Sequence, residues 1–212
     1  MTKRYLITLA AVAALSACGG SGGTGDNDSE ADIGILSSGI LTDVEVPSPA
    51  DLAGLPTEVE DFVNAFVEAN ESFTQTATRP FGTADYAGQY GFGFDAEDNP
   101  TVVYGDMTMG VDFGTGNISG SITNLTGDSE GQVLTIGNDL TVLAVIDNQS
   151  DIAGTVAGDV VLDGQTYDVE ASIAGAFGGD AAETAVGTTM GLVTNPDATT
   201  DSFSGYFLVD KH

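Results

Sequence analysis

Several kinds of side chain are scarce in this sequence, and each scarcity removes a class of function. The 212 residues include one cysteine, one histidine and no tryptophan, and only four residues are basic. A single cysteine cannot form an internal disulfide, so an oxidising compartment would add no covalent link within the chain. The only histidine is the last residue, His212, where chain ends fray, so it cannot serve as a positioned general base. A Ser-His-Asp triad and a zinc site built from histidine or cysteine are therefore excluded.

Other routes to catalysis have little support in the sequence. No glycine-rich segment combines a preceding strand, a following helix and a lysine, as a phosphate-binding loop requires. The acids Asp95, Glu97 and Asp98 could in principle perform glycosidase chemistry, but their segment DAEDNP is typical of a solvated turn. A calcium loop starting at Asp26 is disfavoured because Ala31 stands where such a loop needs glycine. We expect no enzyme, and we predict no catalytic, cofactor-binding or metal-ligating residue.

The charge balance is strongly acidic. The chain has 32 acidic residues and a formal net charge of −28 at pH 7. Such a charge repels nucleic acid and anionic lipid head groups, so we exclude nucleic acid as a partner. A solvated coat suited to high ionic strength is the favoured explanation, and an acidic patch for a basic partner is the alternative. Hydrophobic residues make up 42%, which is enough for one core in one domain with a leader.

The N-terminus has the order of a secretory signal. Basic residues Lys3 and Arg4 precede a short apolar run, and the segment Leu15-Ser16-Ala17-Cys18 closes it. The run is too short to remain as a membrane-spanning helix. Because it ends in the only cysteine, it resembles the lipobox of bacterial lipoproteins. There the thiol receives a diacylglyceryl group, the signal is cut before the cysteine, and the new amine is acylated.

This resemblance implies a lipoprotein signal peptide at residues 1–18 and lipid attachment, with palmitate-type chains, at Cys18. A chance cysteine near an ordinary cleavage site is the alternative. Cleavage would leave two basic residues, Arg79 and Lys211, against the 32 acidic ones, and so a charge near −30. Several acyl chains anchor a protein firmly. We therefore expect the mature protein to sit on a membrane surface without entering the bilayer.

A tether and one helix are expected before the main body. Residues 19–56 begin with the polar, glycine-rich stretch GGSGGTGDNDSEAD and end with three prolines, which is typical of a flexible tether. Residues 57–73 are predicted to form an amphipathic helix, with Thr57 and Glu60 at capping-box spacing. Its apolar stripe consists of Val59, Phe62, Val63, Phe66 and Val67. We expect this stripe to pack on a sheet, and a partner-binding helix is the alternative.

From residue 80 onward the hydrophobic period changes from 3.6 to 2. Apolar alternation or apolar runs occur at residues 83–94, 105–113, 118–123, 133–136, 140–146, 152–162, 167–177, 184–193 and 203–209. Repeated strands without helical crossovers predict an all-β sandwich or closed barrel, and closure would remove exposed edges. The non-core faces carry acids such as Asp85, Asp106 and Asp168, so a water-soluble barrel is favoured over one inside the membrane.

Three segments in this region carry a family resemblance. They are ADYAG at residues 84–88, GDMTMGVDFGTGNISGSITNL at residues 105–125, and IAGAFGGDAAETAVGTTMG at residues 173–191 with the later FSGYFLVDK. Over residues 80–212 the chain resembles the β-barrel domain of the transferrin-binding protein B family of Gram-negative surface lipoproteins. The resemblance implies an antiparallel, eight-stranded closed barrel, displayed by a lipid anchor on the outer membrane and exposed at the cell surface. Thr188 or Thr189 replaces the family's usual aromatic residue, no handle domain is evident, and neither the transferrin ligand nor any binding residue is carried over.

Three hypotheses about function follow. The first is a surface-exposed lipoprotein that binds a host or extracellular protein, or a small ligand, through its barrel rim and loops. We expect the loops at residues 95–103, 126–132 and 194–201 to matter most. The second is a structural or protective envelope protein without a specific ligand. The third is a lipocalin-like carrier with an internal cavity.

Overall fold

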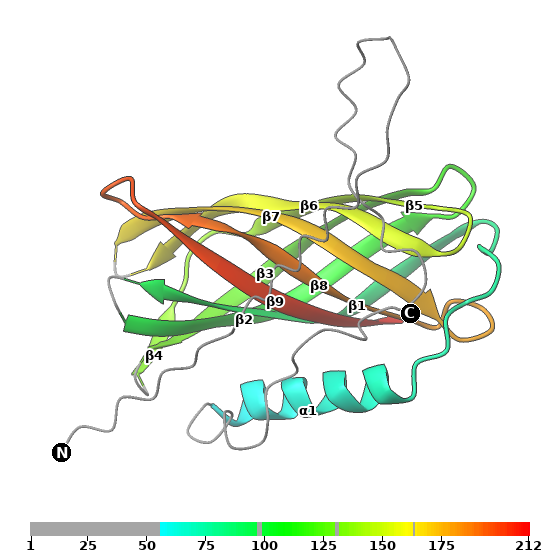
Figure 1. The fold of residues 1–212 in the computed structure, drawn as a ribbon, viewed down its shortest axis with the longest axis horizontal. Coiled ribbons are helices and arrows are strands. Elements are labelled where there is room, and N and C mark those ends of the chain that lie inside the picture. The colour runs from blue at the N-terminus through cyan, green and yellow to red at the C-terminus, as the bar shows by residue number, and fades with distance from the viewer. Residues whose placement is uncertain (1–55, 97–98, 130–131, 163) are drawn as a thin grey trace, which may run out of the picture.

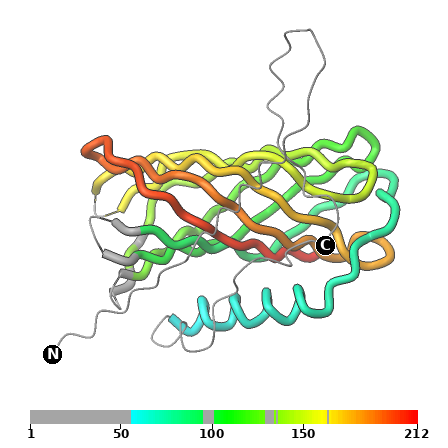
Figure 2. The backbone as a smooth tube through the Cα atoms, viewed as in Figure 1, coloured from blue at the N-terminus to red at the C-terminus, as the bar shows by residue number. Residues whose placement is uncertain are grey.

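The computed structural model describes residues 56–212 except 97–98, 130–131 and 163. One helix precedes a set of long strands (Figure 1), and Figure 2 shows the same path as a tube. The elements are α1 (Thr57–Glu71), β1 (Thr83–Ala96), β2 (Asn99–Asp112), β3 (Asn117–Ser129), β4 (Gln132–Thr135), β5 (Leu140–Ile146), β6 (Asp151–Leu162), β7 (Gln165–Gly178), β8 (Thr184–Thr194) and β9 (Thr200–Lys211).

The strands close into an antiparallel barrel of eight positions. The order around the barrel is β1, β2, β3, β5, β6, β7, β8 and β9, and β9 pairs again with β1. The short strand β4 pairs with the C-terminal part of β3, while β5 pairs with its N-terminal part. Because β4 and β5 run in the same direction beside β3, together they fill one position. The all-β, eight-stranded closed barrel with one preceding helix is therefore confirmed.

The strands β2 and β3 extend beyond the segments predicted from alternation. Their pairing shifts register between Tyr104 and Asp106, and Asn124 on β3 has a φ of 53°. This geometry is a β-bulge, in which one strand carries an extra residue. Before the bulge the even-numbered residues of β3, such as Ile122, face inward, and after it the odd-numbered ones, such as Leu125, do. Both residues are therefore buried although they are three positions apart. The strict alternation therefore stops at residue 123 although the strand continues.

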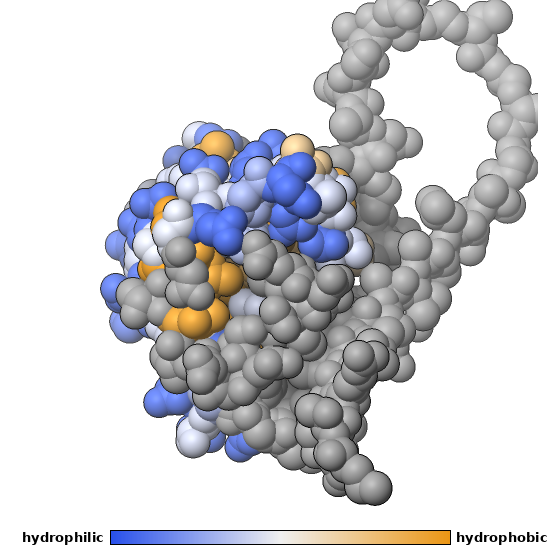
Figure 3. Space-filling model, turned by 90° about the vertical axis from the view of Figure 1, so that its left-hand side faces the viewer, coloured by the Kyte–Doolittle hydropathy of each residue, from blue (hydrophilic) through white to orange (hydrophobic). Residues whose placement is uncertain are grey.

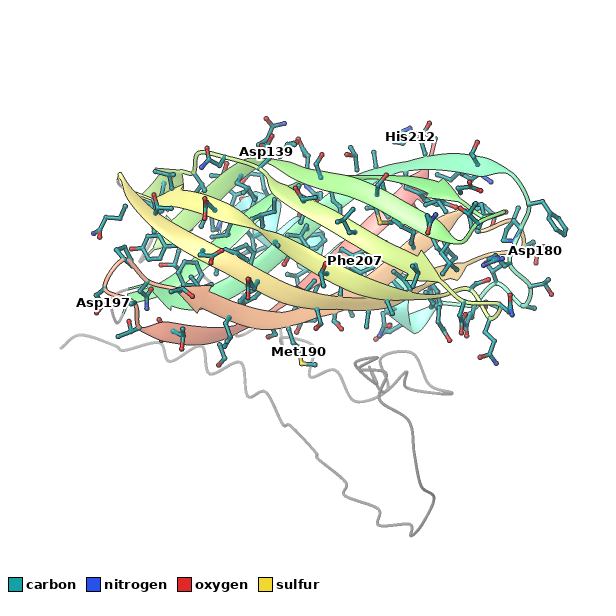
Figure 4. The ribbon with its side chains drawn as sticks, turned by 90° about the horizontal axis from the view of Figure 1, so that it is seen from above. Asp139, Asp180, Met190, Asp197, Phe207 and His212 are labelled. Atoms are coloured by element: carbon teal, nitrogen blue, oxygen red, sulfur yellow. The ribbon has the colours of Figure 1, made fainter. Side chains whose placement is uncertain are left out.

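Large side chains fill the interior of the barrel. The strand β5 has a strictly alternating burial pattern, and Tyr90, Phe177 and Phe207 have no exposed surface. Phe207 lies inside the ring of strands in Figure 4. Two tyrosine hydroxyls are paired within this core: Tyr86 Oη donates to the carbonyl oxygen of Ala182 at 2.5 Å, and Tyr90 Oη lies 2.9 Å from Thr189 Oγ1. The interior is thus a packed core in which the hydroxyls of Tyr86 and Tyr90 are hydrogen-bonded.

The helix α1 lies on the outside of the barrel, over the place where the first and last strands meet. Its residues Val59, Phe62, Val63 and Phe66 are buried against a cluster that includes Val186 of β8 and Tyr206 of β9. The rings of Phe66 and Tyr206 have centroids 4.8 Å apart. Partly buried residues of β2 and β9 complete the cluster. The predicted packing of the apolar stripe on the sheet is therefore what the structure shows.

A glycine in β1 lets the helix approach the sheet closely. A Cβ atom placed on Gly91 would lie 3.2 Å from Cε1 of Phe62, which is tighter than most real contacts. In the ladder Gly91 stands between Tyr104 of β2 and Tyr206 of β9. The missing side chain leaves a notch between two tyrosines, and the Phe62 ring lies against it.

The predicted capping box is wrong. The N-cap residue is Pro56, no side chain caps the helix, and Thr57 is already the first helical residue. The amides of Val59 and Glu60 instead donate to the carbonyl oxygen of Pro56 at 2.9 and 3.1 Å. Pro56 has an extended backbone, with φ of −53° and ψ of 143°, and takes the cap position, so the helix begins one residue earlier than the spacing of Thr57 and Glu60 requires.

The contact between α1 and the barrel seam can be measured by truncating Phe66, which is 1% exposed. We expect Phe66→Ala to lower the free energy of unfolding by about 3–5 kcal/mol, because a buried aromatic side chain is lost and a cavity remains. Urea unfolding followed by circular dichroism gives this value. Glu68→Ala, on the exposed side of the same helix, is the control and should change it by less than about 0.5 kcal/mol. Equal effects of the two variants would contradict the assigned packing.

The buried tyrosines predict a loss of stability at high pH. Burial raises the pKa of Tyr86 above its ordinary value of 10.0, with a smaller contribution from Glu183. Burial also raises the pKa of Tyr90, partly offset by the Thr189 hydrogen bond. Above pH 10 the unfolded chain releases these protons while the folded barrel retains them, so the free energy of unfolding should fall as pH rises.

The variant Tyr86→Phe/Tyr90→Phe isolates this effect. It should be less stable at pH 8, since the Ala182 carbonyl and the Thr189 hydroxyl lose their partners. Between pH 10 and pH 12, however, its stability should fall less steeply than that of the wild type. Urea midpoints across this range test the expectation, and identical slopes would contradict it.

Candidate functional site: the rim end of the barrel

The two ends of the barrel differ in what covers them. The strap end is crossed by the strap, residues 73–82, which links α1 to β1. At the opposite end, here called the rim end, the strands β1, β3, β6 and β8 end. Figure 4 shows Asp180 at the strap end and Asp197 at the rim end. Among the residues that the structure describes, no segment crosses the rim end.

Hydrogen bonds hold the strap against the strap end. The amide of Thr76 donates to the carbonyl oxygen of Phe177 at 2.8 Å, and Thr76 Oγ1 donates to that of Gly179 at 2.7 Å. Gln75 Nε2 donates to the Gln149 carbonyl oxygen and to Asp151 Oδ1, at 2.8 and 2.7 Å. These bonds link the strap to the turns after β5 and β7, so the strap closes this end.

One cation reinforces the same closure. Arg79 Nη1 donates to the carbonyl oxygen of Ile146 at 3.0 Å. A Cβ atom on Gly116 would lie 2.7 Å from this Nη1, and Gly116 has a φ of +82°, so glycine is needed there for both space and conformation. Arg79, one of only four basic residues of the chain, therefore bonds the strap to the end of β5 and lies against Gly116 in the turn after β2.

The carboxylates of the strap end belong to this local structure. Asp147 Oδ1 accepts from the amides of Gln149 and Asp151, at 2.7 and 3.0 Å, and so shapes its own turn. Burial raises the pKa of Asp151, and the nearby charge of Asp147 adds to the rise. The hydroxyl of Ser150 is buried without a hydrogen-bond partner among the described residues.

The rim turn that the structure describes is residues 195–199. The amide of Asn195 donates to the carbonyl oxygen of Thr199 at 2.8 Å, and Asn195 Nδ2 donates to Asp201 Oδ2 at 2.6 Å. Asp197 Oδ1 accepts from the Thr199 hydroxyl at 2.6 Å and from its amide at 2.9 Å, and these bonds lower the pKa of Asp197. The turn is thus internally braced and acidic. Oδ1 of Asn195 is buried without a partner among the described residues.

The three predicted binding loops all fall at the rim end, but two of them are mostly strand. Of residues 95–103, Asp95–Ala96 and Asn99–Val103 lie in β1 and β2, whose pairing continues to Ala96 opposite Asn99. Of residues 126–132, Thr126–Ser129 and Gln132 lie in the paired strands β3 and β4. The third, residues 194–201, is a turn at 195–199 between the ends of β8 and β9. The described residues at the rim are therefore paired strands where longer loops were expected, except for the turn at 195–199. Figure 3 looks at this end and shows hydrophobic residues among hydrophilic ones, partly behind grey atoms.

The remaining predictions about sites have different outcomes. Cys18, the signal and most of the tether lie outside the described residues. Within residues 56–212, gaps excepted, no cluster of three or more histidine, cysteine, aspartate or glutamate residues could hold a metal ion. His212 is exposed, and its amide donates to the Asp85 carbonyl oxygen at 2.9 Å. Over the same residues, no helix has the length and apolar character needed to cross a membrane.

Among known proteins, similarity to this chain is found in solved structures. No protein-family model matches the chain, and no curated protein matches it. The similar solved structures include two of transferrin-binding protein B. One is transferrin-binding protein B from Haemophilus parasuis Hp5, described as a vaccine antigen, with 22% identity and a TM-score of 0.45. The other is intact Ap-TbpB with its N and C lobes, with 18% identity and a TM-score of 0.39.

The predicted resemblance to a transferrin-binding protein B barrel is thus found again among solved structures. Each match covers 65% of this chain, but only 28% and 29% of the two longer chains. The chain therefore spans less than a third of each protein that it matches. The closed barrel itself rests on the strand pairing described above.

Proposed function

We propose that this protein is a surface-exposed outer-membrane lipoprotein whose barrel binds an extracellular protein without catalysing a reaction. The signal and lipobox at residues 1–18 support export and anchoring at Cys18, and residues 19–56 would then be the tether. Similarity to transferrin-binding protein B structures supports a surface-displayed barrel. The ligand of those proteins is not assigned to this chain.

The filled interior is the observation on which the binding mode depends. Side chains such as Tyr90, Phe177 and Phe207 occupy the space that a carrier would keep for its ligand. The lipocalin-like alternative therefore loses its support, and binding has to use the outside of the barrel. The strap covers one end, so the braced turn at residues 195–199 and its neighbouring hairpins are the favoured contact surface. Rigid turns lose little conformational entropy on binding.

Anchoring can be tested independently of any ligand. Mass spectrometry of the protein from its native membrane should find an N-terminal Cys18 that carries acyl chains. A Cys18→Ala variant should lack them and leave the membrane fraction. Protease treatment of intact cells should cut the wild-type protein at the surface. An unmodified thiol at the mature N-terminus, or protection from protease until the cells are permeabilised, would contradict the proposal.

Binding at the rim can be tested by capture from host serum or culture medium. Immobilised protein should retain a protein in a saturable manner, and Pro196→Arg/Ala198→Asn should reduce capture at least about tenfold. Both positions are exposed, and neither supplies a side-chain bond to the turn. Asn148→Arg places the same charge at an exposed turn of the strap end, and it should leave capture unchanged.

Two outcomes count against a rim-binding protein. Absence of saturable capture would favour the structural or protective envelope role, the remaining alternative. If the rim variant and the strap-end variant lose capture equally, the captured protein is attracted by the negative charge of the whole chain and does not depend on the rim.

A further inference from the structure

Apolar side chains are concentrated on one part of the outer wall of the barrel. Among the described residues, five large hydrophobic side chains are exposed, and four of them lie on β5 and β8. They are Leu143 at 58%, Val145 at 56%, Met190 at 64% and Leu192 at 50%. The side chain of Met190 points away from the barrel in Figure 4. An exposed apolar grouping of this kind is typical of a contact surface.

The register places the two apolar pairs on either side of a strip of small residues. Leu143 is opposite Thr155 of β6, Thr155 is opposite Ser172 of β7, and Ser172 is opposite Met190 of β8. The outward faces of β6 and β7 between the two pairs carry only alanine, serine and threonine, apart from Glu170. This surface from β5 to β8 is here called the outer band, and it is roughly 15 Å wide and 15 Å long.

The N-terminal part of the chain reaches the barrel beside this band. The helix α1 begins towards the rim end (Figure 1), and its buried stripe packs with Val186 of β8. Leu192, at one edge of the band, lies on the same strand, roughly 20 Å beyond Val186. Residues 43–56, which precede α1, would span up to about 45 Å if extended. The residues before position 43 can therefore reach any part of the band.

One segment of this chain has the composition that the band requires. Residues 33–42, with the sequence IGILSSGILT, are here called the apolar segment, and they lie outside the described residues. Half of them are isoleucine or leucine and none is charged, whereas residues 26–32 before them and residues 43–45 after them contain six acids. A polar tether needs no such stretch, because apolar residues this dense favour burial. The Ser-Ser-Gly sequence at the centre is typical of a turn, which would bring the two apolar halves side by side.

We propose that the apolar segment covers the outer band of its own chain. A separate molecule would lose its translational and rotational freedom on binding, and a face of roughly 15 Å by 15 Å offers little to offset that loss. A segment joined through residues 43–56 is already held near the band, at an effective concentration in the millimolar range. A small contact therefore suffices within one chain. The segment also brings no charge towards Glu170, whereas a second copy would bring an acidic surface.

Docking would shorten the free part of the tether. Residues 19–32 alone would then separate Cys18 from the barrel, with a reach of roughly 45 Å, where residues 19–56 would reach roughly 125 Å. The barrel would be held closer to the membrane as a result. This consequence rests on the proposed anchor at Cys18, whereas the docking itself does not.

Disulfide trapping tests the docking in the full chain with Cys18→Ser, which has no other cysteine. Ile40→Cys is combined either with Ser172→Cys, in the middle of the band, or with Thr108→Cys, at an exposed position of β2. Under mild oxidation we expect the pair at 40 and 172 to form an intramolecular disulfide at least about tenfold faster than the pair at 40 and 108. Non-reducing electrophoresis and mass spectrometry measure both rates.

Thr108 is a matched control because the start of α1 lies near the same strand. Burial raises the pKa of Tyr104 of β2, and the nearby charge of Glu58 adds to the rise. An undocked segment would therefore reach Thr108 at least as readily as Ser172, so equal rates for the two pairs would overturn the proposal. Disulfide-linked dimers in place of the intramolecular product would assign the band to a neighbouring copy, and would also overturn it.

Proteolysis gives a second measurement that needs no introduced cysteine in the segment. In the Cys18→Ser chain, Met190→Glu should raise the rate of subtilisin cleavage within residues 33–42 at least about fivefold, because a charge under the segment disfavours docking. Thr166→Glu adds the same charge at an exposed position of β7 outside the band, and it should change this rate less than about twofold. Circular dichroism checks that both variants are folded. Equal cleavage rates in the two variants would contradict the docking.

Discussion

The pairing of β1 with β9 is the contact on which the barrel depends. It joins the first and last strands over residues Tyr86 to Gly93 and Ser204 to Lys211, and without it the sheet would have two open edges. The strand β1 has Gly88, Gly91 and Gly93 and β9 has Gly205, and a glycine packs no side chain that would specify the register. The helix supplies what these strands lack, because its aromatic side chains reach β8, β9 and the notch at Gly91 together. A segment outside the barrel is thus part of what keeps it closed.

The packed interior decides where this protein can act. A closed barrel of eight strands has just enough interior for side chains, and here aromatic and branched residues take that space. One end is closed by the strap, and the helix covers part of the outer wall near the seam. The surfaces that stay available include the rim end and the wall formed by β5 to β8. The first is acidic and braced, the second nearly uncharged and apolar, so the two surfaces suit different partners.

The sequence predicted the architecture because alternation survives wherever strands are regular. The predicted first and last residues of β5 are those that the structure has, because Leu140 to Ile146 alternate without interruption. The prediction failed where a local irregularity of the backbone interrupts the hydrophobic alternation. The bulge at Asn124 reverses the facing of β3, so the strand was ended early and its continuation was taken for a loop. Pro100 and the acids near it suggested a loop, yet the proline stands at a hairpin end, where a missing amide is tolerated.

The strap could not have been predicted from residue pattern. Gln75, Thr76 and Arg79 bond to turns that lie far away in the sequence, and nothing in their local spacing indicates those partners. The rim turn was predicted because proline, aspartate and asparagine occur together there. The grouping of exposed apolar side chains on β5 and β8 was not predicted, because the threonine, serine and alanine residues on the outward faces between them look ordinary in the sequence. Only the assembled register shows that they adjoin one another.

The position of His212 has a practical consequence. Its amide is bonded to Asp85, near the start of β1, so the barrel's two chain connections leave from neighbouring points at one end. A reporter joined after His212 would therefore leave the barrel at the strap end, while the turn at 195–199 at the opposite end stays unobstructed.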